Sequence, residues 1–238
     1  SRGLGDVYKR QEQEISMPPA PENNKYNGDE TCDRFEISYT YETPTVPVTE
    51  VTVSYLVESD GRIHVQVDYL GKQGLPELPV LGLRFLMPTA AEGYTYEGLS
   101  GETYPDRMAG GIHGVYEVQG LPVTPYMVPQ DCGMHMQTKW LEIVRKTSLD
   151  NTDREGRSSR LKITAEEGKH FAFSCLPYTA QELENAMHHE ELPPARRTVV
   201  SILGAVRGVG GINSWGADVE DAYHISGEQD ITYGFWIE

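Results

Sequence analysis

Polar and apolar residues alternate in several short segments of this chain. Residues 34–41 read RFEISYTY, with an apolar or aromatic side chain at every second position. The same period of two recurs in residues 51–57 and 63–69. Because successive side chains of a strand point to opposite faces of a sheet, this pattern predicts half-buried β-strands. Ser59-Asp60-Gly61 separates the last two segments, and an Asp-Gly pair favours the positive φ of a tight hairpin turn.

Further strands are predicted by apolar and β-branched runs along the rest of the chain. They cover residues 81–87, 137–144, 161–165, 170–175, 198–203 and 231–237. One short helix is expected after Thr179, because Thr179 and Glu182 fit a capping box in which each side chain accepts from the other's amide. Leu183, Ala186 and Met187 would share one face of that helix. Together these elements predict an all-β protein, an antiparallel sandwich of two sheets with one short helix.

Composition narrows the classes of function. The chain has 238 residues, with 20 Lys and Arg against 36 Asp and Glu, a net charge of −16. That balance lacks the basic footprint of a nucleic-acid binder, and no apolar run approaches the ~18 residues of a membrane span. Cys32, Cys132 and Cys175 are an odd, sparse set without Cys-x-x-Cys spacing. They favour reduced thiols and a cytoplasmic location over a disulfide framework or a zinc site.

The first residues differ in character from the rest of the chain. Residues 1–11 read SRGLGDVYKRQ, which is basic at one end and contains no signal-peptide core. This stretch is either a non-native sequence derived from an adapter or an ordinary disordered terminus. The prolines and asparagines that follow are typical of a linker. We therefore expect residues 1–27 to lie outside the folded domain and residues 28–238 to form it.

A glycine-rich segment is the first candidate for chemistry. Residues 208–216 read GVGGINSWG, without the Lys-Ser/Thr pair of a phosphate loop. Asn213 stands where a dinucleotide fingerprint needs glycine. On such a flexible backbone the indole of Trp215 could lie against the C–H face of a sugar. Composition alone favours the other interpretation, in which Trp215 is a core or interface tryptophan in a glycine-rich turn.

Other candidate sites receive weaker support from the sequence. His188-His189-Glu190-Glu191 suggests a metal site, but adjacent histidines point in different directions and no third ligand is suitably spaced, so a solvated helix end is favoured. Among 36 carboxylates no pair can be selected for glycoside hydrolysis. Cys132 follows Asp131, whose charge disfavours a thiolate, and is interpreted as structural.

Three stretches carry a family resemblance when they are taken in order. Residues 98–107 read GLSGETYPDR, residues 124–133 read TPYMVPQDCG and are followed by Lys139-Trp140-Leu141, and residues 208–216 form the glycine-rich segment. They resemble the segments Glu-x-Tyr-Pro-Asp-Arg, Tyr-Val-x-Pro-Gln-Glu-x-Gly…Arg-Trp and Gly-Val-Gly-Gly-Asp-x-Ser-Trp-Gly of one family. That family is the C-terminal, small-chain region (domain 5) of the glycoside hydrolase family 2 β-galactosidases. The resemblance runs from about Phe35 to Glu238.

The resemblance implies a fold and a role. The family domain is a very large antiparallel supersandwich of the galactose-mutarotase-like type. Its loop tryptophan reaches into the active site and stacks on substrate, which carries over to Trp215 as a substrate-binding residue. Asn213 and Ser214 match the loop and have weaker claims to ligand contact. Several positions depart from the family pattern and put the hydrogen-bond support of the loop in doubt: Ile212, Leu203, Val206, Glu97 and Leu99.

The catalytic residues are expected elsewhere. The family's two glutamates lie on a separate (β/α)8 barrel, and the acid/base follows an asparagine. This chain contains no Asn-Glu dipeptide and has no room for a barrel of ~250 residues. The resemblance therefore implies no catalytic residue, metal site or cofactor in this chain, and places Mg²⁺ and Na⁺ in the barrel part.

Two hypotheses follow for the function. In the first, the chain is part of a β-galactosidase that hydrolyses terminal β-galactosides such as lactose. It would be either a truncated fragment or a separately encoded small subunit. Its expected partners are a barrel-bearing large chain and a galactoside substrate. We also expect the enzyme to be an oligomer. In the second, it is a non-catalytic module that binds galactosides or packs subunits. A mutarotase-like activity shares the sandwich, but a fold alone does not establish function.

Overall fold

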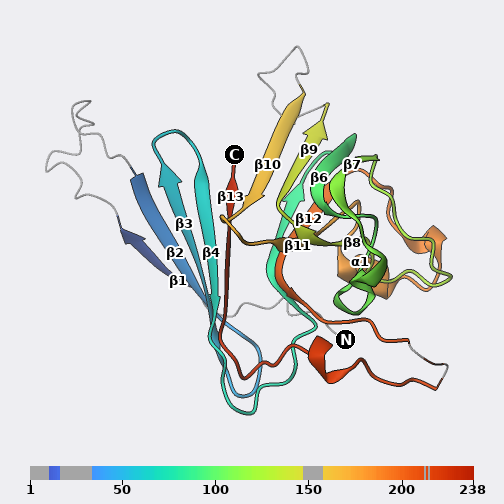
Figure 1. Cartoon of the computed structure of the whole chain (residues 1–238). Coiled ribbons are helices and arrows are strands. Elements are labelled where there is room, and N and C mark those ends of the chain that lie inside the picture. Colours follow the sequence, from blue (N-terminus) through green and yellow to red (C-terminus); the bar gives the residue numbers. More distant parts are fainter. Residues whose placement is uncertain (1–10, 17–33, 147–157, 212, 214) are drawn as a thin grey trace, which may run out of the picture.

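Two antiparallel sheets make up the molecule. The computed structural model describes residues 11–16, 34–146, 158–211, 213 and 215–238. Within these residues nine strands form one sheet and four strands form a second. Figure 1 shows the hairpins of β1 to β4 at one side of the large sheet and α1 at the opposite side of the molecule. The predicted all-β sandwich with one short helix is confirmed.

The large sheet has the spatial order β1-β2-β3-β4-β13-β10-β9-β6-β7. Its strands in that order are β1 Gln11–Ser16, β2 Arg34–Glu42, β3 Glu50–Glu58, β4 Ile63–Tyr69, β13 Ile231–Ile237, β10 Ser159–Ala165, β9 Trp140–Arg145, β6 Gly93–Leu99 and β7 His113–Gln119. The small sheet has the order β5-β12-β11-β8, with bounds Val80–Met87, Thr198–Val206, Phe171–Leu176 and Met134–Thr138.

The main core lies between the facing sides of the two sheets. Phe173 and Ile202 of the small sheet and Phe235 and Ile143 of the large sheet are each no more than 1% exposed. The Phe85 and Phe235 rings meet edge to face across the sheets, with centroids 6.3 Å apart. Since truncating a buried phenylalanine costs about 3–5 kcal/mol, these contacts fix how the sheets sit against one another.

A further layer covers the outer face of the small sheet. Helix α1, Ala180–Asn185, buries Leu183 against Cys132 and Leu176. The 3₁₀ turn η1, Pro105–Gly110, follows Tyr104, which packs on a second cluster that contains Leu203. The layer is thus built from the segments on either side of η1, from residues 123–132 and from α1. Two shorter 3₁₀ turns, η2 His189–Glu191 and η3 Asp221–Tyr223, complete the helical elements of the described chain.

Most of the predicted elements match the structure. The strands at residues 63–69 and 231–237 have the predicted bounds. Gly61 has φ +91° in the turn before β4, as the Asp-Gly pair predicts. The capping box is present, because the Thr179 side chain accepts from the Glu182 amide and the Glu182 side chain accepts from the Thr179 amide.

Three details of the prediction were wrong. The single strand expected over residues 137–144 is two strands, β8 and β9, and the chain passes from the small sheet to the large sheet at Lys139. The strands β6 and β7 were not predicted. Met187 does not join the buried helix face, because α1 ends at Asn185 and the Met187 side chain is 63% exposed.

The first described strand lies in a stretch that was expected to stay outside the domain. β1 pairs antiparallel with β2, from Gln11 opposite Tyr41 to Ser16 opposite Glu36. It is therefore an edge strand of the large sheet. The domain boundary at residue 28 stays a prediction, as does the origin of residues 1–11.

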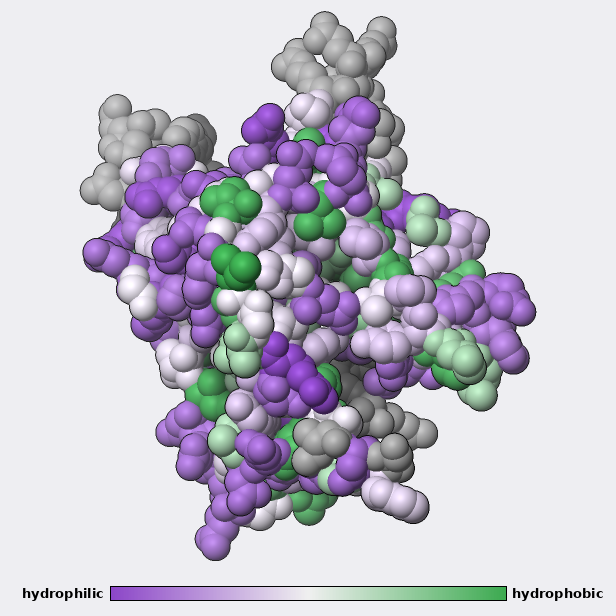
Figure 2. Space-filling model, turned by 45° about the vertical axis from the view of Figure 1, so that its right-hand side comes forward, coloured by the Kyte–Doolittle hydropathy of each residue, from purple (hydrophilic) through white to green (hydrophobic). Residues whose placement is uncertain are grey.

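The surface agrees with the acidic composition. Hydrophilic residues cover most of the face in Figure 2, and hydrophobic ones are scattered over it in small groups. Within the described residues, no helix combines the length and the apolar character needed to cross a bilayer.

Candidate functional site

The glycine-rich segment begins where β12 ends, and its first glycine is held in a tight place. The Gly208 amide donates to the Tyr223 carbonyl at 3.0 Å. A Cβ at Gly208 would lie 2.9 Å from the Tyr223 Cβ and 3.0 Å from the Asp106 Cγ. Real Cβ atoms essentially never approach that closely, so the backbone requires glycine here. The following Gly210 and Gly211 have φ of +69° and +74°, the left-handed region that glycine enters without steric cost.

Asp106 anchors this segment from η1. Its two carboxylate oxygens accept hydrogen bonds from the Val209 and Gly210 amides, at 3.0 and 2.9 Å. The neighbouring Arg107 side chain donates to the Gly210 carbonyl. The Asp106 side chain is only 9% exposed. Burial opposes its ionisation, but the two amide hydrogen bonds outweigh burial and lower the pKa of Asp106.

Trp215 stands on the turn that follows. Its side chain is 92% exposed, the most exposed large aromatic in the described chain. The interpretation of Trp215 as a core tryptophan is therefore wrong for this chain, whereas its place at an interface stays a prediction. The Trp215 amide donates to Asn213 Oδ1 at 2.9 Å, and the Ala217 amide donates to the same oxygen at 3.3 Å. Asn213 thus shapes the turn beneath the indole. Ser214 and Ile212 lie outside the described residues.

A second network links the other two stretches of the family resemblance. Glu102 accepts hydrogen bonds from the Gly133 amide at 3.0 Å and from the Tyr104 hydroxyl at 3.2 Å. The Thr124 hydroxyl also donates to Glu102. Residues 98–107 therefore contact residues 124–133 through Glu102 and residues 208–210 through Asp106. The structure thus brings the three stretches together through hydrogen bonds to these two carboxylates.

A third network holds the residues that directly precede and follow the glycine-rich segment. Arg207 pairs with Asp218 and lies 3.5 Å from Glu77, measured from Nε to Oε2. The His224 Nδ1 lies 2.7 Å from Glu77 Oε1, and its Nε2 donates to the Val219 carbonyl at 3.1 Å. The ion pair with Glu77, followed by the hydrogen bond to Val219, raises the pKa of His224. Arg207 in turn lowers the pKa of Asp218. Both ends of the glycine-rich segment are thereby fixed.

The arrangement supports stacking more directly than acid–base chemistry. The two carboxylates nearest the loop backbone are already engaged, Asp106 with amides and Asp218 with Arg207. The free surface is the indole of Trp215, which is apolar with one N–H donor. In the part of the chain that the structure describes, no three His, Cys, Asp or Glu side chains are grouped as metal ligands would be.

The other candidate residues have structural partners. His188 Nδ1 lies 2.9 Å from Glu191 Oε1, and His189 Nε2 lies 2.6 Å from the Tyr126 carbonyl. The two histidines had been expected at the end of the helix. They instead follow α1, and His189 begins the separate turn η2. Cys132 and Cys175 are buried free thiols. Burial, more than the charge of Asp131, raises the pKa of Cys132, so the expected cause was secondary.

The supporting residues Asp106, Arg107 and Glu102 were missed as site residues. They lie in the first stretch of the family resemblance, but the sequence alone gave no reason to assign them a role. The departures at Leu203 and Val206 had cast doubt on the support of the loop. Leu203 is instead 5% exposed in a core cluster, and the support comes from η1. No local signal could have found them, because Asp106 lies 104 positions before the Gly210 amide that it accepts from.

Comparison with known proteins gives a consistent result. A family model described as the β-galactosidase small chain matches residues 5–237. The "Beta-galactosidase small subunit" of Latilactobacillus sakei is 60% identical over 225 residues, which cover 94% of this chain and 70% of that protein. The "Beta-galactosidase" of Streptococcus thermophilus is 35% identical over 87% of this chain and 19% of its own length. That of Lactobacillus delbrueckii subsp. bulgaricus is 33% identical over 84% of this chain and likewise 19% of its own length.

Proposed function

Because the chain belongs to the β-galactosidase small-chain family, we propose that it presents Trp215 to a galactoside within an active site completed by a large chain. It would be a non-catalytic but necessary part of an enzyme that hydrolyses terminal β-galactosides such as lactose. The observation that carries this proposal is the exposed indole of Trp215 on a turn whose two ends are fixed.

The share of each relative that this chain spans supports placing binding on this chain and catalysis on a large chain. The chain spans 70% of a relative named as a small subunit, but only about a fifth of the relatives named simply as β-galactosidase. The remaining four fifths of those longer proteins are ample for a catalytic barrel of ~250 residues. We place the catalytic glutamate pair there, on the large chain. Any Mg²⁺ and Na⁺ would belong to the large chain as well.

The chemistry assigned to this chain is binding and orientation. A retaining glycosidase needs two carboxyl groups about 5–5.5 Å apart around the scissile bond, and an oriented sugar ring between them. An indole face packs against the C–H face of a sugar and excludes water from it. Asn213 sets the turn that carries the indole, and Asp106 sets the glycine segment before it. Contacts of Asn213 and Ser214 with the sugar are part of the same proposal.

The proposal is tested by substitution of Trp215 in the enzyme assembled with its large chain. Trp215→Ala should reduce kcat/KM for a β-galactoside by the equivalent of about 1–3 kcal/mol, the loss of one aromatic contact. Trp236→Phe is a matched control, since Trp236 lies on β13 in the large sheet. Unchanged kinetics in Trp215→Ala would remove this residue from the site.

The second candidate function uses the same exposed indole. If the chain binds galactosides by itself and its addition does not alter the kinetics of the large chain, it is a binding or packing module. Calorimetry with galactose on the isolated chain and on its Trp215→Ala variant, set beside the assembled-enzyme kinetics, separates the two.

A further inference from the structure

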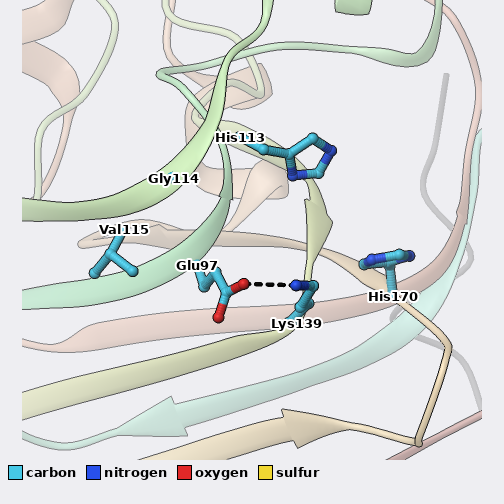
Figure 3. Close-up of a pocket in the computed structure, with 6 residues that line it drawn as sticks. All are labelled: Glu97, His113, Gly114, Val115, Lys139 and His170. Atoms are coloured by element: carbon cyan, nitrogen blue, oxygen red, sulfur yellow. Dashed lines mark hydrogen bonds and ion pairs between the residues drawn. The ribbon is translucent and has the colours of Figure 1, made fainter.

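A pocket lies where the chain crosses between the two sheets. The chain leaves β8 in the small sheet and enters β9 in the large sheet through Lys139. It makes the reverse crossing between β10 and β11, ending at His170. β6 and β7, at the edge of the large sheet, close the other side. Figure 3 shows the side chains from these four segments converging on one hollow.

The hollow has a size suited to a small ligand. Its volume is about 360 Å³, and its lining combines four chargeable or polar side chains with two apolar positions: Glu97, His113, Gly114, Val115, Lys139 and His170. Ligand sites in proteins commonly measure ~300–1,000 Å³. Val115 is 61% exposed at the rim, so an apolar surface faces the opening.

A fixed hydrogen-bond network organises the polar side of this pocket. Lys139 Nζ donates to Glu97 Oε1 at 2.7 Å, and the Trp140 indole donates to Glu97 Oε2 at 2.9 Å. The lysine hydrogen bond, followed by that of the indole, lowers the pKa of Glu97. His113 Nε2 is paired with Gln137 Oε1 at 2.7 Å. The carboxylate and one imidazole are therefore held in place before any ligand arrives.

Gln137 adopts an uncommon backbone conformation to make that contact. Its φ of +54° is the only positive value among the non-glycine residues that the structure describes. A non-glycine residue in the left-handed region costs about 1 kcal/mol or more. This strain falls at the end of β8, next to the crossing at Lys139, where it aims the Gln137 amide at the His113 ring.

The groups that line the pocket retain capacity for further hydrogen bonds. A carboxylate has about four acceptor positions, and Glu97 uses two of them. An ammonium has three N–H donors, and Lys139 gives one to Glu97. The second nitrogen of His113 and the His170 ring add to this set. Donors and acceptors thus stand side by side, as the adjacent hydroxyl groups of a sugar require.

Charge favours a neutral ligand over an anion. The Lys139 ammonium is balanced by Glu97 at 2.7 Å, so the pair presents no net charge. The chain as a whole carries a net charge of −16, which repels anions.

We propose that this pocket is a saccharide-binding site for one neutral, hydroxyl-rich sugar unit. Glu97 and Lys139 bind neighbouring hydroxyl groups, His113 and His170 bind a further one, and Val115 contacts the C–H face. The site uses none of the residues of the glycine-rich segment and stands independently of the function proposed for Trp215.

The three tryptophans of the chain offer a direct test by NMR. In a ¹H–¹⁵N spectrum each indole N–H gives one signal, assigned by Trp→Phe substitution at Trp140, Trp215 or Trp236. D-galactose is titrated into the full chain at pH 7.5. The Trp140 signal should move and saturate, because its indole hydrogen-bonds the Glu97 carboxylate. Movement of the Trp215 signal alone would support binding at the loop and overturn the proposed pocket site.

Two variants and a control complete the test. Lys139→Met and His170→Ala should each weaken the Trp140 response about tenfold, the usual effect of losing one hydrogen bond to a charged or polar partner. His188→Ala, an exposed histidine paired with Glu191, should leave it unchanged. A Trp140 signal that does not respond to galactose, or that responds in both variants as strongly as in the wild type, overturns the proposal. A response to inorganic phosphate at pH 6 without one to galactose overturns it in favour of an anion site.

Discussion

Asp106 and Gly210 are 104 positions apart in the chain, yet the Gly210 amide donates to Asp106 Oδ2 at 2.9 Å. With the companion hydrogen bond from Val209, the carboxylate caps two successive amides of the glycine-rich segment. The segment that carries Trp215 is therefore positioned by a residue of η1. This contact joins two of the three stretches by which the family was recognised.

Replacement of Asp106 should release the glycine-rich segment. Asp106→Asn keeps the size of the side chain but replaces one acceptor oxygen with a donor group that faces an amide. Hydrogen bonds to charged groups contribute about 1.5–3 kcal/mol, so amide hydrogen exchange at Val209 and Gly210 should accelerate roughly tenfold to a hundredfold. Exchange measured by NMR or mass spectrometry at pH 7 checks this.

The same contact has a predictable dependence on pH. The folded pKa of Asp106 lies below its ordinary value, so its contribution is present above about pH 4 and is lost as the pH falls through the lowered value. The control for the exchange experiment is Asp68→Asn. Asp68 accepts hydrogen bonds from Thr232 and Gln66 on the large sheet, away from the glycine-rich segment. Equal exchange at Val209 and Gly210 in wild type and Asp106→Asn would show that the carboxylate does not hold the segment.

Removal of the Trp215 side chain should leave the stability of the isolated chain almost unchanged. The side chain is 92% exposed, and surface substitutions usually alter the free energy of unfolding by no more than about 0.5 kcal/mol. Urea unfolding of Trp215→Ala beside wild type measures this difference. A loss of 2 kcal/mol or more, which is the scale of a buried aromatic, would show that the indole packs against the protein.

His135 should make the fold sensitive to mild acid. It is 5% exposed, stacks on Phe173 with ring centroids 4.7 Å apart, and shares a hydrogen bond with the Tyr94 hydroxyl at 3.0 Å. Burial lowers the pKa of His135 to about 4. The unfolded chain therefore binds a proton more readily, and this residue's contribution to stability is complete above about pH 6.5 and is lost progressively toward pH 4.

The size of that effect follows from linkage. Between pH 7.5 and pH 5, His135 alone should lower the free energy of unfolding by about 2 kcal/mol. The measurement is urea unfolding at both pH values, in wild type and in His135→Phe, which stays neutral throughout. The pH-dependent difference should shrink by about 2 kcal/mol in the variant, whatever its absolute stability. An identical difference in both proteins would contradict the assignment.

The capping box should be measurable against a neighbouring glutamate. Glu182 accepts from the Thr179 amide at 2.9 Å and pairs with Arg197, whereas Glu184 is an exposed residue of the same helix. Glu182→Gln should lower the free energy of unfolding by about 1 kcal/mol, the usual scale of a lost cap interaction. Glu184→Gln should change it by less than about 0.5 kcal/mol. Equal effects of the two substitutions in chemical denaturation would argue against a stabilising capping box.

The alternation of side chains was a sufficient guide to most strands, but it failed where glycine or a sheet crossing intervened. β6 reads GYTYEGL, and its glycines hide the inward pattern of Tyr94 and Tyr96. The crossing at Lys139 contains no glycine or proline to mark it. Such a crossing is decided by which sheet each half can pair with, and that depends on residues far away in the sequence.

The site was only partly predictable for the same reason. Trp215 could be singled out because its loop matches a family segment. Its support could not be seen, because the contact between Asp106 and Gly210 spans more than a hundred residues. The pocket at Glu97 and His113 was also missed, because its four segments meet only once both sheets have formed.

The most direct test of the account is β-galactosidase activity in a mixing experiment. This chain, the large chain of the Latilactobacillus sakei enzyme, and the two together are assayed with a chromogenic β-galactoside. The account predicts no hydrolysis by this chain alone, and hydrolysis by the mixture well above that of the large chain alone. It also predicts that the gain is smaller with Trp215→Ala. Hydrolysis by this chain alone, or a mixture no more active than the large chain, would contradict the claim that it completes a site built mainly on a partner.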